Sequence, residues 1–137
     1  MTTGLVNAFC ASTHLVVPFV LDVLSAERVG LFLRNVRTMR GQLFPHLQLA
    51  GVVGTLKGDG TEILRETEKK AISEAEGGVS KFWGAGDYVL KDVLIPRKQS
   101  IADTAGNGVD LAVATLFHPL GQRLFTLTTP VRSAAAA

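Results

Sequence analysis

The sequence has little of what secreted and membrane proteins depend on. Its single cysteine, Cys10, cannot form an internal disulfide, which argues against a disulfide-stapled scaffold and favours an intracellular setting. The longest apolar run, residues 15–21, contains Pro18 and falls far short of the roughly 20 residues that span a bilayer. No basic segment precedes that run, as one would in a signal peptide. We therefore expect a cytoplasmic protein with no membrane association.

Charge and metal-binding motifs are also sparse. The formal net charge of +2 is too small to indicate nucleic-acid binding by itself. His14, His46 and His118 are far apart, and neither a His-x-x-x-His nor a Cys-x-x-Cys spacing occurs. There is no serine-centred nucleophile elbow. The sequence therefore predicts no metal site and no catalytic residue.

What is present is enough apolar side chain for one folded domain. Hydrophobic residues make up 47% of the 137 positions, a proportion that suits a single globular unit with a substantial core. The chain ends in four alanines, which favour a disordered terminus. We expect one α/β domain over residues 1–130 and a disordered tail over residues 131–137.

Three apolar segments have the composition of β-strands. They lie at residues 14–20, 47–54 and 88–95. Pro18 should close the hydrogen-bonded ladder of the first strand, and Pro96 should end the third, because proline has no N–H to donate. The second segment is apolar almost throughout and reads as a strand buried on both faces, which is typical of the middle of a parallel sheet.

Segments of helical periodicity alternate with these strands. They lie at residues 3–11, 26–42, 60–76 and 109–120. Ser25 and Asp59 are the expected N-caps of the second and third helices, and Gly77 with Gly78 should end the third. Pro119 should interrupt the last helix. Strands alternating with helices indicate an α/β fold, in which helices flank both faces of a three-stranded parallel sheet.

A series of short motifs runs through nearly the whole chain. They are Asn7-Ala8, His14-Leu15-Val16-Val17-Pro18, Leu49-Ala50-Gly51-Val52-Val53, Leu94-Ile95-Pro96-Arg97, Ile101-Ala102-Asp103 and the stretch from Gly106 to Gly108. In this order they resemble the C-terminal half of the ParA-type partition ATPases, the deviant P-loop proteins related to MinD. The resemblance implies a P-loop NTPase-like, or Rossmann-like, layer architecture.

The resemblance also implies a function. Such proteins are dimers that use ATP and Mg²⁺ to move plasmids, chromosomes or other cargo, bind DNA without sequence preference and respond to a partition partner protein. This sequence lacks the family's glycine-lysine phosphate loop and the acidic strand end that holds magnesium. Because phosphoryl transfer depends on that loop and metal, we expect no ATP hydrolysis by this chain alone, and no cofactor of its own.

Two stretches are candidates for the base side of a nucleotide site. Lys57-Gly58-Asp59, with Thr55 before it, resembles the Lys-x-Asp that reads guanine in some related GTPases, although Leu56 stands where Asn or Thr is usual. The alternative is a helix-capping loop without a ligand. The resemblance places Pro96 and Arg97 against adenine, and a strand end followed by a solvated arginine is the alternative there.

Arg34, Arg37 and Arg40 recur at helical spacing and form one outward stripe on the second predicted helix. They are candidates for non-specific DNA binding through phosphates, and a solvated helix face is the alternative. Two hypotheses thus stay open. One is a ParA-like protein, catalytically incomplete, that requires a missing N-terminal half or forms a homo-oligomer through an exposed strand edge. The other is a non-catalytic protein- or DNA-binding module on the same scaffold.

Overall fold

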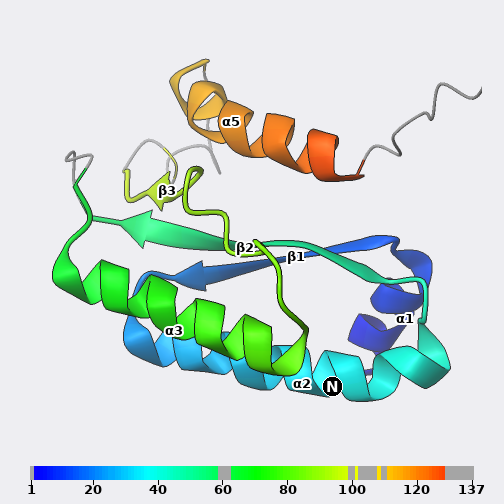
Figure 1. Cartoon of the computed structure of the whole chain (residues 1–137). Coiled ribbons are helices and arrows are strands. Elements are labelled where there is room, and N and C mark those ends of the chain that lie inside the picture. Colours follow the sequence, from blue (N-terminus) through cyan, green and yellow to red (C-terminus); the bar gives the residue numbers. More distant parts are fainter. Residues whose placement is uncertain (1, 59–62, 99–100, 102–107, 109–110, 129–137) are drawn as a thin grey trace, which may run out of the picture.

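The computed structural model describes residues 2–58, 63–98, 101, 108 and 111–128. Three strands, β1 (His14–Val20), β2 (Gln48–Lys57) and β3 (Ile95–Pro96), pair in parallel in the order β1-β2-β3. Two long helices lie side by side on one face of the sheet, and α5 (Leu111–Thr128) crosses the other face (Figure 1). The predicted α/β fold, a parallel three-stranded sheet with helices on both faces, is confirmed.

The first strand is correctly placed, but Pro18 does not end its ladder. β1 pairs with β2 up to Val20, and Pro18 itself stands opposite Val53. β1 is an edge strand, and proline is tolerated there when its missing N–H would face the open side. The prediction was wrong because it considered only that proline cannot donate, and an edge strand needs N–H donors on one side alone.

The helix after β1 begins earlier than predicted. α2 spans Val23–Leu43, and its N-cap is Asp22, whose carboxylate accepts a hydrogen bond from the Ser25 N–H at 2.8 Å. Ser25 is therefore the third residue of the helix and not its cap. The short first helix, α1 (Thr3–Ala11), follows the prediction, with Thr2 as its N-cap.

β2 is the buried central strand. Its residues from Leu49 to Gly54 are all buried, as predicted, but the strand continues to Lys57, three residues past the expected end. A Cβ on Gly54 would come 2.7 Å from Leu21 Cδ2. Glycine is thus needed here for packing between layers, which accounts for it without a ligand.

The third helix, α3 (Glu66–Phe82), differs from its prediction at both ends. It begins six residues later than Gly60, and the expected cap, Asp59, lies outside the described residues. The helix continues past Gly78 to Phe82. At Gly78, α3 crosses α2 at very close range. A Cβ built on Gly78 would lie 3.0 Å from the Gly30 Cα. Gly78 serves the packing of α3 against α2, whereas a Cβ on Gly77 would meet open space, and neither glycine ends the helix.

The third predicted strand is mostly irregular. Within residues 88–95, Val89 forms one isolated bridge with Val52, and β3 proper is limited to Ile95–Pro96. The chain turns at Lys91 and Asp92, which are exposed, and the Lys91 ammonium lies 2.8 Å from a Glu76 carboxylate oxygen. The two consecutive polar residues, Lys91 and Asp92, thus interrupt the apolar segment and break the strand.

α5 passes through Pro119 without ending. Its inner side, including Leu120 and Leu124, covers a small core made by β2 and the segment before β3. The core members there are Val53, Leu90, Val93 and Ile95. The helix was predicted from periodicity, but its extension to Thr128 was not. The predicted helix residue Val109 and the tail at 131–137 lie outside the described residues.

Candidate functional site

The carboxyl ends of the three parallel strands meet at one edge of the sheet, where open α/β sheets bind ligands. Register places Lys57 opposite Pro96, and the Arg97 N–H donates to the Lys57 carbonyl at 2.9 Å. The structure therefore brings together three of the predicted base-side residues, from stretches about forty positions apart. The fourth, Asp59, lies outside the described residues.

Thr55, the remaining candidate, has a structural role within the sheet. It lies on β2 and not in a loop, and its hydroxyl donates to the Phe19 carbonyl at 2.9 Å. Its own carbonyl accepts from the Leu21 N–H at 3.1 Å. Both contacts join the ends of β1 and β2, so Thr55 helps to hold the edge on which the other candidates lie.

Leu56, between the two candidate residues of β2, has an unusual backbone. Its φ of +57° is in the left-handed region, which non-glycine residues with bulky side chains rarely occupy. The pairing with β3 shifts register at this point. Such a conformation costs on the order of 1–3 kcal/mol and persists where the surrounding structure imposes it. The result is a half-exposed leucine side chain at the tip of the central strand.

Two clefts open on either side of Leu56 and Arg97. One, of about 300 Å³, is mainly polar. It is lined by Val20, Leu21, Leu56, Gly58, Arg65, Thr67, Glu68 and Arg97. The other, of about 440 Å³, is mainly apolar. It is lined by Thr55, Leu56, Ile95, Pro96, Arg97, Lys98, Ile101 and Phe117. An apolar cleft beside a polar one suits a ligand with one flat apolar part and one polar part.

Glu68 organises the polar cleft. Only 6% of the residue is exposed, and its carboxylate accepts hydrogen bonds from the Gly58 N–H at 2.7 Å and the Arg65 N–H at 2.8 Å. The bond from Gly58 is the main reason that the pKa of Glu68 is lowered, and burial opposes it. One buried carboxylate thereby joins the end of β2 to the start of α3.

Among the described residues that line the two clefts, positive side chains outnumber the one carboxylate, Glu68. Lys57, Arg65, Arg97 and Lys98 stand at or beside the clefts, while the carboxylate of Glu68 already accepts two backbone N–H groups. Such an edge favours an anionic ligand. Sequence reasoning missed Arg65 and Glu68. The only signal was the acidic pair Glu66 and Glu68 near a helix start, and an arginine is not a residue from which an N-cap is predicted.

The three arginines of the predicted DNA-binding stripe lie on α2, beside the end of α3. The Arg37 guanidinium donates to the Phe82 carbonyl at 3.1 Å, and that of Arg40 donates to the Leu47 carbonyl at 2.6 Å. Arg34 lies over the Phe82 ring at 5.9 Å. Arg34 and Arg37 are exposed and Arg40 is half-buried. Arg34 and Arg37 therefore contact the end of α3, and Arg40 joins α2 to the residue before β2. DNA binding by them stays a prediction.

Metal and membrane sites are not indicated in the part of the chain that is described. Within residues 2–58, 63–98, 101, 108 and 111–128, no three His, Cys, Asp or Glu side chains gather in a way that could hold a metal ion. No helix within that part is long and apolar enough to cross a membrane. Comparisons of the whole chain with protein-family models and with curated proteins gave no match.

Proposed function

We propose that this chain is a ParA-like domain that forms the base side of a nucleotide site and does not hydrolyse the nucleotide on its own. The observation that carries the proposal is the adjacency of Lys57, Pro96 and Arg97 at the carboxyl edge of a parallel sheet. ParA-type motifs first indicated Pro96 and Arg97, and the strand register that joins them to Lys57 is independent of those motifs.

The two clefts suggest how such a ligand would lie. The apolar cleft, with Pro96 and Phe117 in its lining, would take the flat base, and Arg97 could stack on it through its planar guanidinium. Arg65 and Lys57 would attract the anionic part. Phosphoryl transfer also needs a phosphate loop and a metal ion. This sequence contains neither the loop nor the acidic strand end that holds the metal. ATP and Mg²⁺ therefore belong, in this proposal, to the complete ParA-like assembly.

The wider role in this proposal is partition of plasmids or chromosomes, or positioning of another cargo. The α/β fold supports it, since helices on both faces of a parallel sheet are what a P-loop NTPase-like layout requires. A partition partner protein, and either a second copy or an N-terminal half, would complete the machinery.

A binding titration tests the nucleotide site. A fluorescent ATP analogue is added to the wild type and to Arg97→Ala, with Lys70→Ala as control because Lys70 is an exposed cation of α3 that lines neither cleft. We expect Arg97→Ala to weaken binding about tenfold, the loss of about 1.4 kcal/mol, and Lys70→Ala to leave it unchanged. Phosphate release should stay at background. No binding at millimolar nucleotide, or equal binding by both variants, would contradict the proposal.

A second candidate function, a non-catalytic DNA-binding module, is favoured by the neighbouring exposed guanidinium groups of Arg34 and Arg37. Anisotropy titrations of a duplex at several salt concentrations test it. Replacing Arg34 with Ala should weaken binding to all sequences alike and lower the salt slope by about one. Arg37→Lys, which keeps the charge, should retain most of the affinity. A DNA affinity that does not change with salt concentration would contradict DNA binding by this arginine stripe.

A further inference from the structure

Glu68 is the only buried charged residue in the part of the chain that is described. Two backbone N–H groups compensate its charge. Its Oε1 accepts from the Gly58 N–H at 2.7 Å, and its Oε2 accepts from the Arg65 N–H at 2.8 Å. A buried carboxylate costs folding free energy unless such partners are supplied. The burial of Glu68 is therefore explained by what its two bonds hold together.

Only one of these bonds belongs to an ordinary helix start. Arg65 is the N-cap of α3 and Glu68 is the third residue of the helix, where a glutamate commonly accepts from the N–H of the N-cap residue. The bond from Gly58 is different, because Gly58 directly follows the end of β2 and is not part of the helix. One carboxylate thus fixes the end of β2 and the start of α3.

The same two backbone segments place the Arg65 side chain. A Cβ built on Gly58 would come 2.8 Å from the Arg65 Cζ, so the guanidinium lies directly on the Gly58 backbone. Gly58, Arg65 and Glu68 all line the polar cleft, together with Arg97. Because Glu68 fixes both segments, it sets the position of the Arg65 guanidinium at the cleft.

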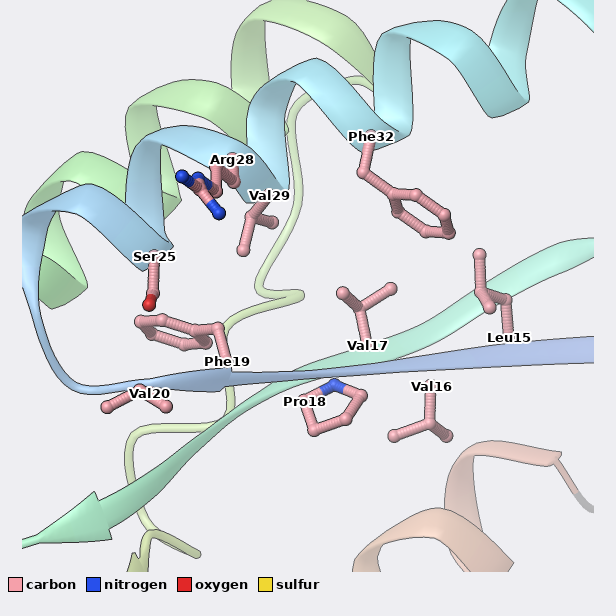
Figure 2. Close-up of a pocket in the computed structure, with 10 residues that line it drawn as sticks. All are labelled: Leu15, Val16, Val17, Pro18, Phe19, Val20, Ser25, Arg28, Val29 and Phe32. Atoms are coloured by element: carbon pink, nitrogen blue, oxygen red, sulfur yellow. The ribbon is translucent and has the colours of Figure 1, made fainter. Parts of the chain in front are cut away.

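A larger cleft, between β1 and α2, has no such arrangement. It has a volume of about 470 Å³ and is lined by side chains of both elements (Figure 2). Apart from Ser25 and Arg28 these residues are apolar, and Arg28 is the one charged residue among them. An anionic group would meet a single guanidinium there, whereas Arg65 and Arg97 both line the polar cleft. The anionic part of a nucleotide is therefore better suited to the polar cleft.

We propose that Glu68 is the positioning residue for the anionic side of the nucleotide site. It keeps the Arg65 guanidinium on Gly58, at the wall of the polar cleft, where the guanidinium pairs with a phosphate group of the ligand. Holding the guanidinium in place before the ligand arrives lowers the entropic cost of binding. This role rests on the proposed function, since it belongs to the same site. Glu68 acts through Arg65 and contacts no ligand itself.

Positioning and simple electrostatics predict opposite results when Glu68 is replaced. Glu68→Gln removes a negative charge beside the polar cleft, so on Coulomb attraction alone an anion would bind more tightly. The amide has one oxygen and its NH₂ group only donates, so it does not satisfy both the Gly58 and the Arg65 N–H groups. Release of either segment should weaken the binding of an anion instead. The sign of the change separates the two explanations.

Titrations of the whole chain with a fluorescent ATP analogue, and with adenosine that carries the same fluorophore, test the proposal. Glu68→Gln should weaken binding of the ATP analogue about fivefold and leave adenosine binding unchanged, because adenosine has no phosphate. Glu66→Gln is the matched control, since Glu66 is in the same turn of α3 but has an 88% exposed side chain that bonds to Lys69. It should not weaken binding of either ligand. Circular dichroism confirms that each variant is folded.

Two further variants test the role of the guanidinium. Gly58→Ala leaves Glu68 unchanged, but its Cβ would displace the Arg65 guanidinium, a flexible group whose movement costs little stability. It should weaken binding of the ATP analogue about as much as Glu68→Gln does. A protein with both Arg65→Ala and Glu68→Gln should bind the analogue as Arg65→Ala alone does, because both changes act through one guanidinium.

The outcomes separate this role from the proposed function. If wild type binds neither ligand, the proposed function is wrong, and the role of Glu68 is overturned with it. If wild type binds the ATP analogue and Glu68→Gln binds it equally or more tightly, the nucleotide site stands and positioning by Glu68 is overturned. Equal binding of both ligands by wild type, an equal loss for both ligands in Glu68→Gln, or additive losses in the double variant also overturn it.

Discussion

The two faces of the sheet differ in how completely they are covered. On one, α2 and α3 pack so closely that Gly30 and Gly78 are in contact, and side chains such as Leu33 are fully buried. On the other, α5 and Ile101 cover a small core, and Val16, Pro18 and Val20 of β1 are exposed. The comparison indicates that the α2–α3 side provides most of the stability. The candidate nucleotide site lies at the carboxyl edge of the sheet, and the candidate DNA-binding arginines, Arg34 and Arg37, lie on the surface of α2.

The largest expected effect comes from a cavity on the well-covered face. Leu33→Ala removes a fully buried side chain, and we expect it to lower the free energy of unfolding by about 3 kcal/mol. Leu127→Ala, in the partly exposed end of α5, should cost less than about 1 kcal/mol. Urea denaturation of both variants measures the difference. Equal losses of unfolding free energy in the two variants would show that the two faces of the sheet contribute equally to stability.

The close helix crossing gives the next largest effect. Gly78→Val places side-chain atoms where the Gly30 backbone lies, and we expect a loss of about 2 kcal/mol. Gly77→Ala is the matched control, since a Cβ there meets open space, and it should stabilise α3 by up to about 1 kcal/mol. Thermal or urea unfolding checks both. A Gly78→Val protein as stable as wild type would mean that the helices can separate at no cost.

At the carboxyl edge, Glu68→Gln should cost about 1–2 kcal/mol, because an amide cannot accept from both Gly58 and Arg65 as the carboxylate does. The folded-state pKa of Glu68 is below its ordinary value of 4.5, so its contribution is complete above that pH and is lost as the pH falls through the lowered pKa. Urea unfolding from neutral pH to pH 3 should show wild type and variant converging in acid. If the difference in unfolding free energy between wild type and Glu68→Gln stays constant across this pH range, the ionised carboxylate is not its source.

The smallest effect concerns the start of α2. Asp22→Ala removes the side chain that accepts from the Ser25 N–H and should destabilise the protein measurably. Ser25→Ala leaves that backbone bond in place and should have less effect, in contrast to the cap predicted from the sequence. Paired denaturation curves decide between the two residues. A greater loss of stability in Ser25→Ala than in Asp22→Ala would instead support Ser25 as the N-cap.

The pattern of apolar residues predicted the parallel α/β fold, because apolar residues recur at helical spacing in the helices and form short continuous runs in the strands. It placed the element ends less well, since these depend on tertiary context. Ser25 is an ordinary N-cap residue, and only the path of the chain from Val20 makes Asp22 the cap. Residues 88–95 have the composition of a strand, but Lys91 and Asp92 turn outward to solvent.

The candidate site was predictable where it depends on topology. Lys57, Pro96 and Arg97 meet because parallel strands end at the same edge, a rule that applies before any coordinates are known. Glu68 was not predictable, because its role depends on where β2 ends. The backbone of Leu56 was not predictable either, because a register shift between β2 and β3 imposes it.

Trp83, the only tryptophan, lies just past the end of α3, half-buried, with the Arg40 guanidinium 5.2 Å from its ring centroid. It packs against the cores that α2 shares with the sheet and with α1, while α5 is on the far face. Its fluorescence therefore reports on one side of the molecule, and far-UV circular dichroism reports on every helix. If α5 detaches before the rest unfolds, the two signals will give different transition midpoints, and no added label is needed to detect it.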